Sequence, residues 1–298
     1  MTADTSAEAS EDQRASLTSR VLPMMTLSEG SSPLTRPLAL VPSTSARERA
    51  EARFQVYGKA IVTGGAGALG LISAQALLEH GLSSLCIMDL PKTLETSSEE
   101  IQSLASKFPS VDITKIPLDV TSIESIEAAF EQANKTMQGI DILCCFAGIP
   151  GCQPSLSVTP DQFNKVIDVN LNGSFFCAQA AAKRMESSGK GGCILFTASM
   201  SAHYTNFPQP QAAYNASKAG VAHLTRNLAA EWAVHGIRVN SISPGLEDVR
   251  KIWDSRCPMG RMGDPEEITG AVVLLCSQRA GRYITGADII IDGGTLTL

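Results

Sequence analysis

The chain has 298 residues and a formal net charge of −6, and 44% of its residues are hydrophobic. This acidic balance argues against a basic surface for nucleic acid, and the longest apolar runs fall well short of the roughly 18 residues that suggest a membrane span. The eight cysteines include no C-x-x-C pair, so they indicate buried thiols of an intracellular protein rather than a metal or redox site.

The first 53 residues are rich in Ser, Thr, Pro, Ala and Glu and show no sustained hydrophobic period. We therefore expect residues 1–53 to be a disordered tail. Acidic side chains near the start argue against a mitochondrial presequence, and no apolar segment marks secretion, so we expect a cytoplasmic protein. Residues 54–298 are enough for one large α/β core and need no second domain.

The first strand signal is the apolar run at 60–62, which breaks into T-G-G-A-G-A-L-G at 63–70 and then into a helical pattern. In this strand–loop–helix context, G-x-G-x-x-G predicts a tight turn that brings the backbone and a helix N-terminus close to a pyrophosphate. A plain glycine turn between packed elements is the structural alternative. The predicted cofactor contacts in this loop are Gly65, Gly67, Ala68, Leu69 and Gly70.

A second apolar strand ends at Asp89, nineteen residues after Gly70. A carboxylate at this place can accept hydrogen bonds from both ribose hydroxyls of NAD, and it would repel the 2′-phosphate of NADP. The sequence therefore predicts NAD in preference to NADP. An acidic strand end without a ligand is the alternative.

From residue 59 onward strand and helix signals alternate, which is typical of a parallel sheet covered by helices on both faces. We predict a single doubly wound Rossmann-type domain with a sheet of about seven strands. Capping residues before a proline mark helix starts at 159–161 and 264–267. A cofactor would lie across the carboxyl ends of the strands, where the chain places Asp89, Asp119 with its neighbour Val120, Ala147, Gly148, Ser199, Pro244 and Gly245.

The run Y-N-A-S-K puts Tyr214 and Lys218 one helical turn apart on the same face. A phenol has a pKa of about 10, and a nearby ammonium group lowers that pKa toward the working range of a proton donor or acceptor. The pair is therefore a candidate for proton transfer. A surface Tyr/Lys pair without a function is the alternative.

Further motifs follow in a fixed order: L-D-V-T at 118–121, C-F-A-G at 145–148, V-N-L-N-G at 169–173, T-A-S-M-S at 197–201, N-S-I-S-P-G at 240–245, G-R-M-G-D-P-E-E at 260–267 and I-D-G-G at 291–294. With the glycine loop and the Tyr/Lys pair, this order resembles the short-chain dehydrogenase/reductase family from residue 54 to the C-terminus. Three segments are similar to those of fungal polyol and ketose dehydrogenases, such as mannitol 2-dehydrogenase and arabinitol dehydrogenase: A-S-M-S-A-H, P-Q-P-Q-A-A-Y-N-A-S-K and A-A-E-W.

The resemblance implies an NAD(H)-dependent oxidoreductase that interconverts a secondary alcohol and a ketone, with a polyol and ketose as one such pair. It implies that Tyr214 is the general base, that Lys218 lowers the Tyr214 pKa and holds the nicotinamide ribose, and that Ser199 holds the substrate oxygen. Asn170 would anchor a water relay from Lys218 and, with Tyr214 and Lys218, lie against the cofactor. The expected partners are the small-molecule substrate and further copies of the chain, in a dimer or tetramer.

Two positions near Ser199 leave choices open. The spacing to the tyrosine that is usual in the family selects Ser201, whereas the A-S-M-S-A context selects Ser199, which we choose. His203 on the same loop could face substrate hydroxyls, although a lone histidine is more often a satisfied loop residue.

The chain departs from the family pattern in three places. Ala68 replaces the middle glycine of the loop, and Cys145-Phe146 replaces Asn-Asn. Only 12 residues, without a threonine, lie between Gly245 and Pro258, where the family has a longer lid over the substrate. Because the lid is short, two alternative interpretations stay open. The chain could be a catalytically weak nucleotide-binding member of the family, or the sequence could be a mis-assembled gene model of an active enzyme.

Overall fold

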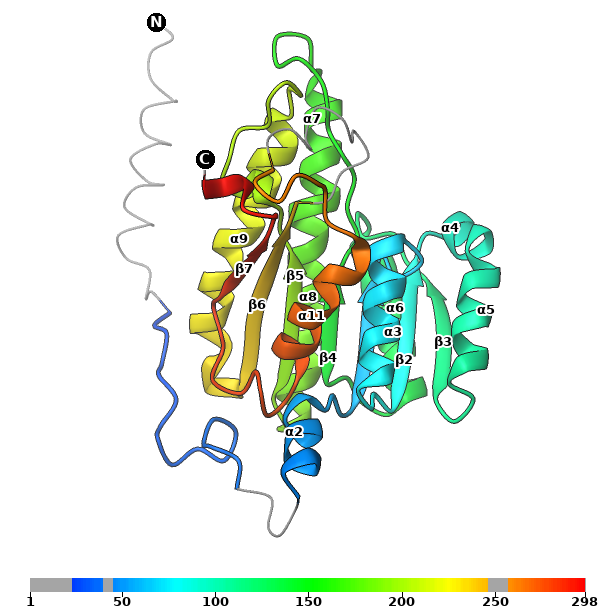
Figure 1. Cartoon of the computed structure of the whole chain (residues 1–298), viewed down its shortest axis with the longest axis vertical. Helices are drawn as coiled ribbons and strands as arrows, with labels where there is room; N and C mark the ends of the chain where they lie inside the picture. Colours follow the sequence, from blue (N-terminus) through cyan, green and yellow to red (C-terminus); the bar gives the residue numbers. More distant parts are fainter. Residues whose placement is uncertain (1–22, 40–44, 246–256, 298) are drawn as a thin grey trace, which may run out of the picture.

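The computed structural model describes residues 23–39, 45–245 and 257–297. Within these ranges the chain forms one sheet of seven strands, all paired in parallel, in the order β3-β2-β1-β4-β5-β6-β7 (Figure 1). The strand order reverses between β1 and β4, which confirms the predicted doubly wound Rossmann-type sheet. The strands are β1 Lys59–Thr63, β2 Ser84–Asp89, β3 Asp112–Pro117, β4 Ile142–Cys145, β5 Gly192–Thr197, β6 Ile237–Pro244 and β7 Asp288–Ile291.

Helices cover both faces of the sheet, because alternate residues of each strand point to opposite sides. In β1, Ile61 packs in one apolar cluster with helices α6, α8 and α9, whereas Ala60 and Val62 pack in a second cluster with α3, α5 and α11. The first group is α6 Ile123–Met137, α8 Ser174–Ser188 and α9 Ala212–Trp232, and the second is α3 Ala68–Glu79, α5 Ser98–Lys107 and α11 Thr269–Cys276.

Shorter helices connect these elements and shape the edge of the sheet where the strands end. They are α2 Ala46–Phe54, α4 Pro91–Thr96, α7 Pro160–Ile167, the π-helical turn η1 Asp168–Gly173 and the 3₁₀ turns η2 Met200–Ala202, η3 Ala233–His235, η4 Pro265–Ile268 and η5 Thr295–Thr297. The predicted helix starts are present. Thr159 caps α7 and Asp264 caps η4, which leads into α11.

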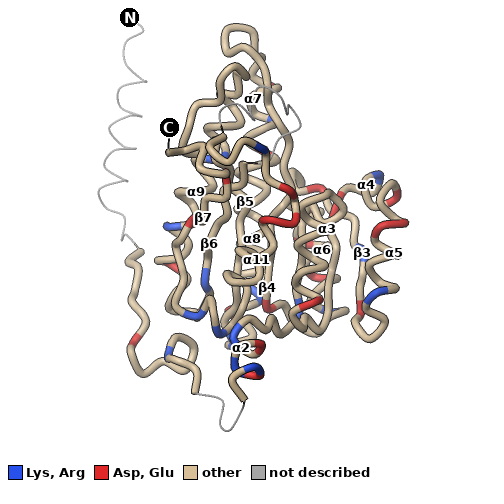
Figure 2. Tube along the Cα trace, viewed as in Figure 1, with Lys and Arg blue, Asp and Glu red and all other residues tan. Residues whose placement is uncertain are grey.

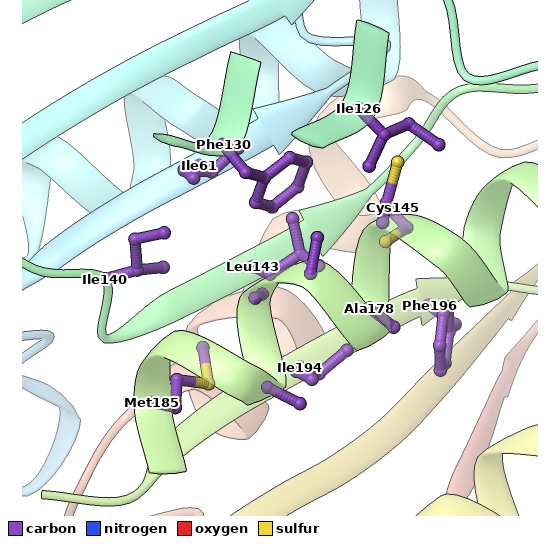
Figure 3. Packing of buried hydrophobic residues seen from close by; sticks show 14 of the residues in the cluster. Ile61, Ile126, Phe130, Ile140, Leu143, Cys145, Ala178, Met185, Ile194 and Phe196 are labelled. Carbon is purple, nitrogen blue, oxygen red and sulfur yellow. The ribbon is translucent and has the colours of Figure 1, made fainter. Parts of the chain in front are cut away.

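The larger apolar cluster fills the space between the sheet and helices α6 and α8. Phe130 of α6 reaches toward Leu143 of β4, and Phe196 of β5 lies near Ala178 of α8 (Figure 3). Phe130, Leu143 and Phe196 are all inaccessible to solvent. Seven of the eight cysteines, including Cys144 and Cys145 of β4, are buried as expected, whereas Cys152 in the loop after β4 is exposed, contrary to the expectation of buried thiols.

The N-terminal region differs from the expected structureless tail. Residues 46–54 form helix α2 without any buried residue, and its start is fixed by a capping box between Ser45 and Glu48. A capping box and helix-forming side chains stabilise such a helix without the hydrophobic period that we looked for. In its last turn the Arg53 carbonyl accepts hydrogen bonds from Ser277 Oγ and the Ala280 amide. Residues 1–22 lie outside the described part of the chain.

Residues 23–39 lie at the lower left of Figure 1, and Leu34 is close to Gly236 between η3 and β6. The Arg282 guanidinium donates to the carbonyls of Leu34 and Arg36, each at 2.9 Å, and Arg279 donates to the Ala39 carbonyl at 3.1 Å. These bonds attach the segment to the loop between α11 and β7.

Charges are spread along the chain in the view of Figure 2, where Lys and Arg alternate with Asp and Glu on several elements. None of the helices in the described ranges combines the length and apolar character that crossing a membrane requires.

The core makes a stability prediction. Phe130→Ala should lower the free energy of unfolding by about 3 to 5 kcal/mol, because it removes a fully buried ring and leaves a cavity between α6 and the sheet. The matched control is Leu156→Ala, which removes an apolar side chain from a fully exposed position and should change the stability by less than about 0.5 kcal/mol. Urea unfolding followed by circular dichroism measures both, and equal losses in the two variants would contradict this packing.

Candidate functional site

A large cleft lies at the carboxyl ends of β1, β2 and β4, where the strand order reverses. Its volume is about 890 Å³. Six of the fifteen residues predicted to bind a cofactor line it, namely Gly67, Asp89, Asp119, Val120, Ala147 and Gly148, and Gly64 and Phe146 line it as well. Parallel sheets bind nucleotides at this place because several helix N-termini and loops converge there.

The glycine loop closes one side of this cleft with a very tight turn. A Cβ atom on Gly70 would lie 2.4 Å from the Gly64 carbonyl oxygen, and one on Gly65 would lie 2.6 Å from the Val62 carbonyl oxygen. Larger residues would therefore push the loop away from β1. Helix α3 begins directly after Gly67, and no side chain caps its N-terminus. Free amide groups at a helix start, in a loop of glycine and alanine, suit the pyrophosphate of a dinucleotide.

The first two departures from the family pattern are accommodated at the cleft. Ala68 is the first residue of α3 and is exposed, so its methyl group lies at the surface of the loop. Cys145 is buried, and Phe146 lines the cleft while its amide donates to the Thr63 carbonyl at 2.8 Å. This backbone bond ties the end of β4 to β1 in the absence of asparagine side chains.

Asp89 fixes a negative charge beside the glycine loop. One carboxylate oxygen accepts from the Ala66 amide at 3.2 Å, and the other accepts from the Leu90 amide at 2.8 Å. These two bonds hold the carboxylate in place while it still lines the cleft. A phosphate group bound next to it would meet a like charge.

A second, smaller hollow of about 60 Å³ brings together residues that are distant in the sequence. Tyr214, Ser199 and Leu69 line it, with Thr197, Ala198, Met200, Pro244 and Gly245. The hydroxyl of the competing Ser201 is buried and has no hydrogen-bond partner among the described residues, and Ser201 does not line the hollow. The geometry therefore favours Ser199 as the serine that faces a ligand.

Lys218 lies behind this hollow and is buried. Its Nζ is 5.7 Å from the centre of the Tyr214 ring and donates to the Thr197 carbonyl at 2.7 Å. Burial lowers the pKa of Lys218 from its ordinary value of 10.5 to about 8, because desolvation disfavours the charged ammonium. The ammonium group thus lies one helical turn from the phenol, as the Y-N-A-S-K spacing predicts.

Asn170 lies in the π-helical turn η1 and is fully buried. Its Oδ1 accepts from the Ile149 amide at 2.8 Å, and its Nδ2 donates to the Ile149 carbonyl at 3.0 Å and to Ser217 Oγ at 3.1 Å. One amide side chain thus joins the loop after β4 to helix α9. Bonds to main-chain groups such as Ile149 leave no signature in the sequence.

The alternative of His203 facing a substrate is not what the structure shows. The imidazole Nε2 lies 2.7 Å from Asp288 Oδ2, and His203 does not line the hollow around Tyr214. Asp288 was missed because it lies 85 residues further along the chain, at the start of β7. Of the short lid, residues 246–256 lie outside the described residues, and the last one, Cys257, is buried.

Comparison with known proteins gives the same assignment as the motifs. Residues 64–296 match a family model described as enoyl-(acyl carrier protein) reductase. A probable NADP-dependent mannitol dehydrogenase of Yarrowia lipolytica is 37% identical over 81% of this chain and 89% of its own length, and a galactitol 2-dehydrogenase of Rhizobium johnstonii is 39% identical over 81% and 96%. A crystal structure of a short-chain type dehydrogenase/reductase from Mycobacterium marinum superimposes with a TM-score of 0.76 at 37% identity, covering 82% of this chain and 97% of that one.

The buried ammonium group makes a prediction about pH. Between pH about 8 and 10.5 the unfolded chain still binds a proton that folded Lys218 has released, so this residue makes the free energy of unfolding rise with pH in that interval. Lys218→Met removes the titration. When the pH is raised from 7.5 to 9.5, the free energy of unfolding of the cofactor-free wild type should therefore increase relative to that of the variant by an amount on the order of 1 kcal/mol. Urea unfolding at the two pH values measures this difference. Parallel pH curves for the two proteins would contradict the lowered pKa.

Proposed function

Because the chain belongs to the short-chain dehydrogenase/reductase family, we propose that it is a nicotinamide-dependent oxidoreductase that interconverts a secondary alcohol and a ketone, with a polyol and ketose as the substrate pair. The observation that carries this proposal is the meeting of Ser199 and Tyr214 in one hollow, with the Lys218 ammonium behind them and the nucleotide cleft beside them. The polyol and ketose pair is supported by relatives whose names specify mannitol and galactitol.

The nicotinamide cofactor, when bound, supplies the acceptor or donor of hydride. Tyr214 takes the hydroxyl proton of the alcohol in oxidation and returns it to the carbonyl oxygen in reduction. Ser199 holds that oxygen by a hydrogen bond and so fixes the distance over which the proton moves. Lys218 places a positive charge near the phenol and favours its ionised form. Asn170 keeps the loop at Ile149 and helix α9 in register, and we assign to it the anchor of a water relay to Lys218.

We also propose that the enzyme prefers NAD to NADP. The support is the fixed Asp89 carboxylate on the wall of the cleft next to the glycine loop. The relative from Yarrowia lipolytica is named as NADP-dependent, so this preference would distinguish the present chain from it. The remaining proposals are a cytoplasmic location, as expected from the sequence, and a homo-oligomer, dimer or tetramer, which the family resemblance implies.

A catalytically weak nucleotide-binding protein was the competing function. Its sole basis was the short segment after Gly245, which lies outside the described residues. The reported relatives are named as dehydrogenases and match nearly their full length to this chain. The enzyme is therefore the better supported function.

Tyr214→Phe removes the titrating hydroxyl and keeps the ring. The variant should lose at least about 100-fold in kcat, because a positioned general acid or base contributes that much, while its affinity for NAD(H) should stay within about twofold. Oxidation of a panel of polyols, followed by the absorbance of NADH or NADPH, measures the rate. The control Tyr283→Phe changes a fully exposed tyrosine and should leave kcat unchanged. If Tyr214→Phe keeps more than about a tenth of the activity, another group carries the proton.

Asp89→Ala tests the cofactor preference. Wild type should bind NAD more tightly than NADP by about 10-fold or more, because the phosphate of NADP would approach a fixed carboxylate, and Asp89→Ala should narrow the ratio. Isothermal titration calorimetry with both nucleotides gives the ratio directly. Asp112→Ala is the control, since Asp112 is exposed at the start of β3, the opposite end of that strand from the cleft. Equal or tighter binding of NADP by wild type would overturn the proposal.

A further inference from the structure

The turn that carries Ser199 is short and is held at both ends. Ser199 precedes the single 3₁₀ turn η2, and its hydroxyl accepts from the Ser201 amide at 3.1 Å. At the front end the Ala198 amide donates to the Ile242 carbonyl of β6 at 2.8 Å. At the back end His203 closes the turn, because its amide donates to the Met200 carbonyl at 2.9 Å.

The side chain of His203 connects this end of the turn to β7, the edge strand of the sheet. Its Nε2 lies 2.7 Å from Asp288 Oδ2 in β7, and a carboxylate only accepts, so this nitrogen is the donor. The Asp288 side chain is only 5% exposed and also accepts from Ser241 Oγ at 2.8 Å and from Ser243 Oγ at 2.8 Å. Both serines belong to β6 and are fully buried. The Asp288 carboxylate of β7 is therefore held by hydrogen bonds from β6, independently of its contact with His203.

The same end of the turn is attached to the helix that carries Tyr214. Asn215 Nδ2 donates to the Tyr204 carbonyl at 3.3 Å, so the residue after His203 is tied to α9 next to Tyr214. Ser199 and Tyr214 line the same hollow. The position of the Ser199 hydroxyl relative to the phenol thus depends on a turn whose far end is held by Asp288 and by Asn215.

We propose that His203 and Asp288 are positioning residues for Ser199. They touch neither the glycine cleft nor the hollow, and they act by holding the turn from Ser199 to His203 against the sheet. The arrangement is not a hydrolytic triad. Asp288 and Ser243 approach the same imidazole nitrogen, and that nitrogen donates to the carboxylate, so it cannot also take a proton from the serine.

A kinetic test rests on the proposed dehydrogenase activity. His203→Ala should lower kcat by about 10-fold or more while the Kd for NAD(H) stays within about twofold, because the cofactor cleft is untouched. His203→Gln can still offer an amide N–H to Asp288 and should recover at least part of the rate. In a Ser199→Ala background, His203→Ala should change kcat by less than about twofold, since a residue that acts through Ser199 has nothing left to position.

The matched control is His235→Ala. It removes another histidine that pairs with a carboxylate, Glu186, at 3.2 Å on an exposed part of the surface, and it should change neither kcat nor the Kd for NAD(H). An undiminished kcat in His203→Ala would overturn the proposal. A further loss of kcat by about 10-fold or more when His203→Ala is added to Ser199→Ala would also overturn it.

A second readout is independent of any substrate. Hydrogen–deuterium exchange of the peptide around 198–205 reports the amide bonds of Ala202 and His203 within the turn. Exchange of this peptide should be faster in His203→Ala than in wild type and unchanged in His235→Ala. If the panel reveals no turnover by wild type but exchange responds as expected, the proposed function fails and the positioning survives. Unchanged exchange in His203→Ala overturns the positioning whatever the activity.

Discussion

The bond from the Lys218 ammonium to the Thr197 carbonyl is the interaction on which the arrangement of the site depends. It joins helix α9 to the end of β5, so the phenol on the helix and the serine after the strand are placed by one contact. The contact forms inside the protein, where a charged group is costly unless it is hydrogen-bonded. The desolvation of the ammonium group explains the lowered pKa of Lys218.

Most of the fold could be predicted from local signals. The alternation of apolar strands with helices gives a parallel sheet, and the glycine loop marks the first strand and the place of the nucleotide cleft. Helix α2 escaped prediction because it buries no residue; a capping box at its start and the bonds from Ser277 and Ala280 to the Arg53 carbonyl stabilise it instead. The π-helical form of the turn at Asn170 was also missed, since it follows from packing against the loop at Ile149 and not from propensity.

The site shows the same division between local and distant information. Tyr214 and Lys218 could be paired because four residues in a helix make one turn, and Asp89 could be placed because it ends a strand. The choice between Ser199 and Ser201 needed the structure, since both lie on one short turn and only the fold determines which hydroxyl reaches the hollow. The carboxylate partner of His203 is beyond any local pattern, because β7 becomes a neighbour of the serine turn only through the pairing of β6 with β7.

The attachment of residues 23–39 has a consequence for how this part of the chain can vary. Arg282 and Arg279 bind the carbonyl oxygens of Leu34, Arg36 and Ala39, and every amino acid supplies such an oxygen. Beside Leu34 the restricted residue is Gly236, since a Cβ on Gly236 would lie 2.6 Å from the Leu34 Cβ. Homologous chains could therefore exchange nearly every side chain of this segment and keep its route. In homologous chains, this attachment would be recognised by Arg279, Arg282 and Gly236, and hardly by the sequence of residues 23–39.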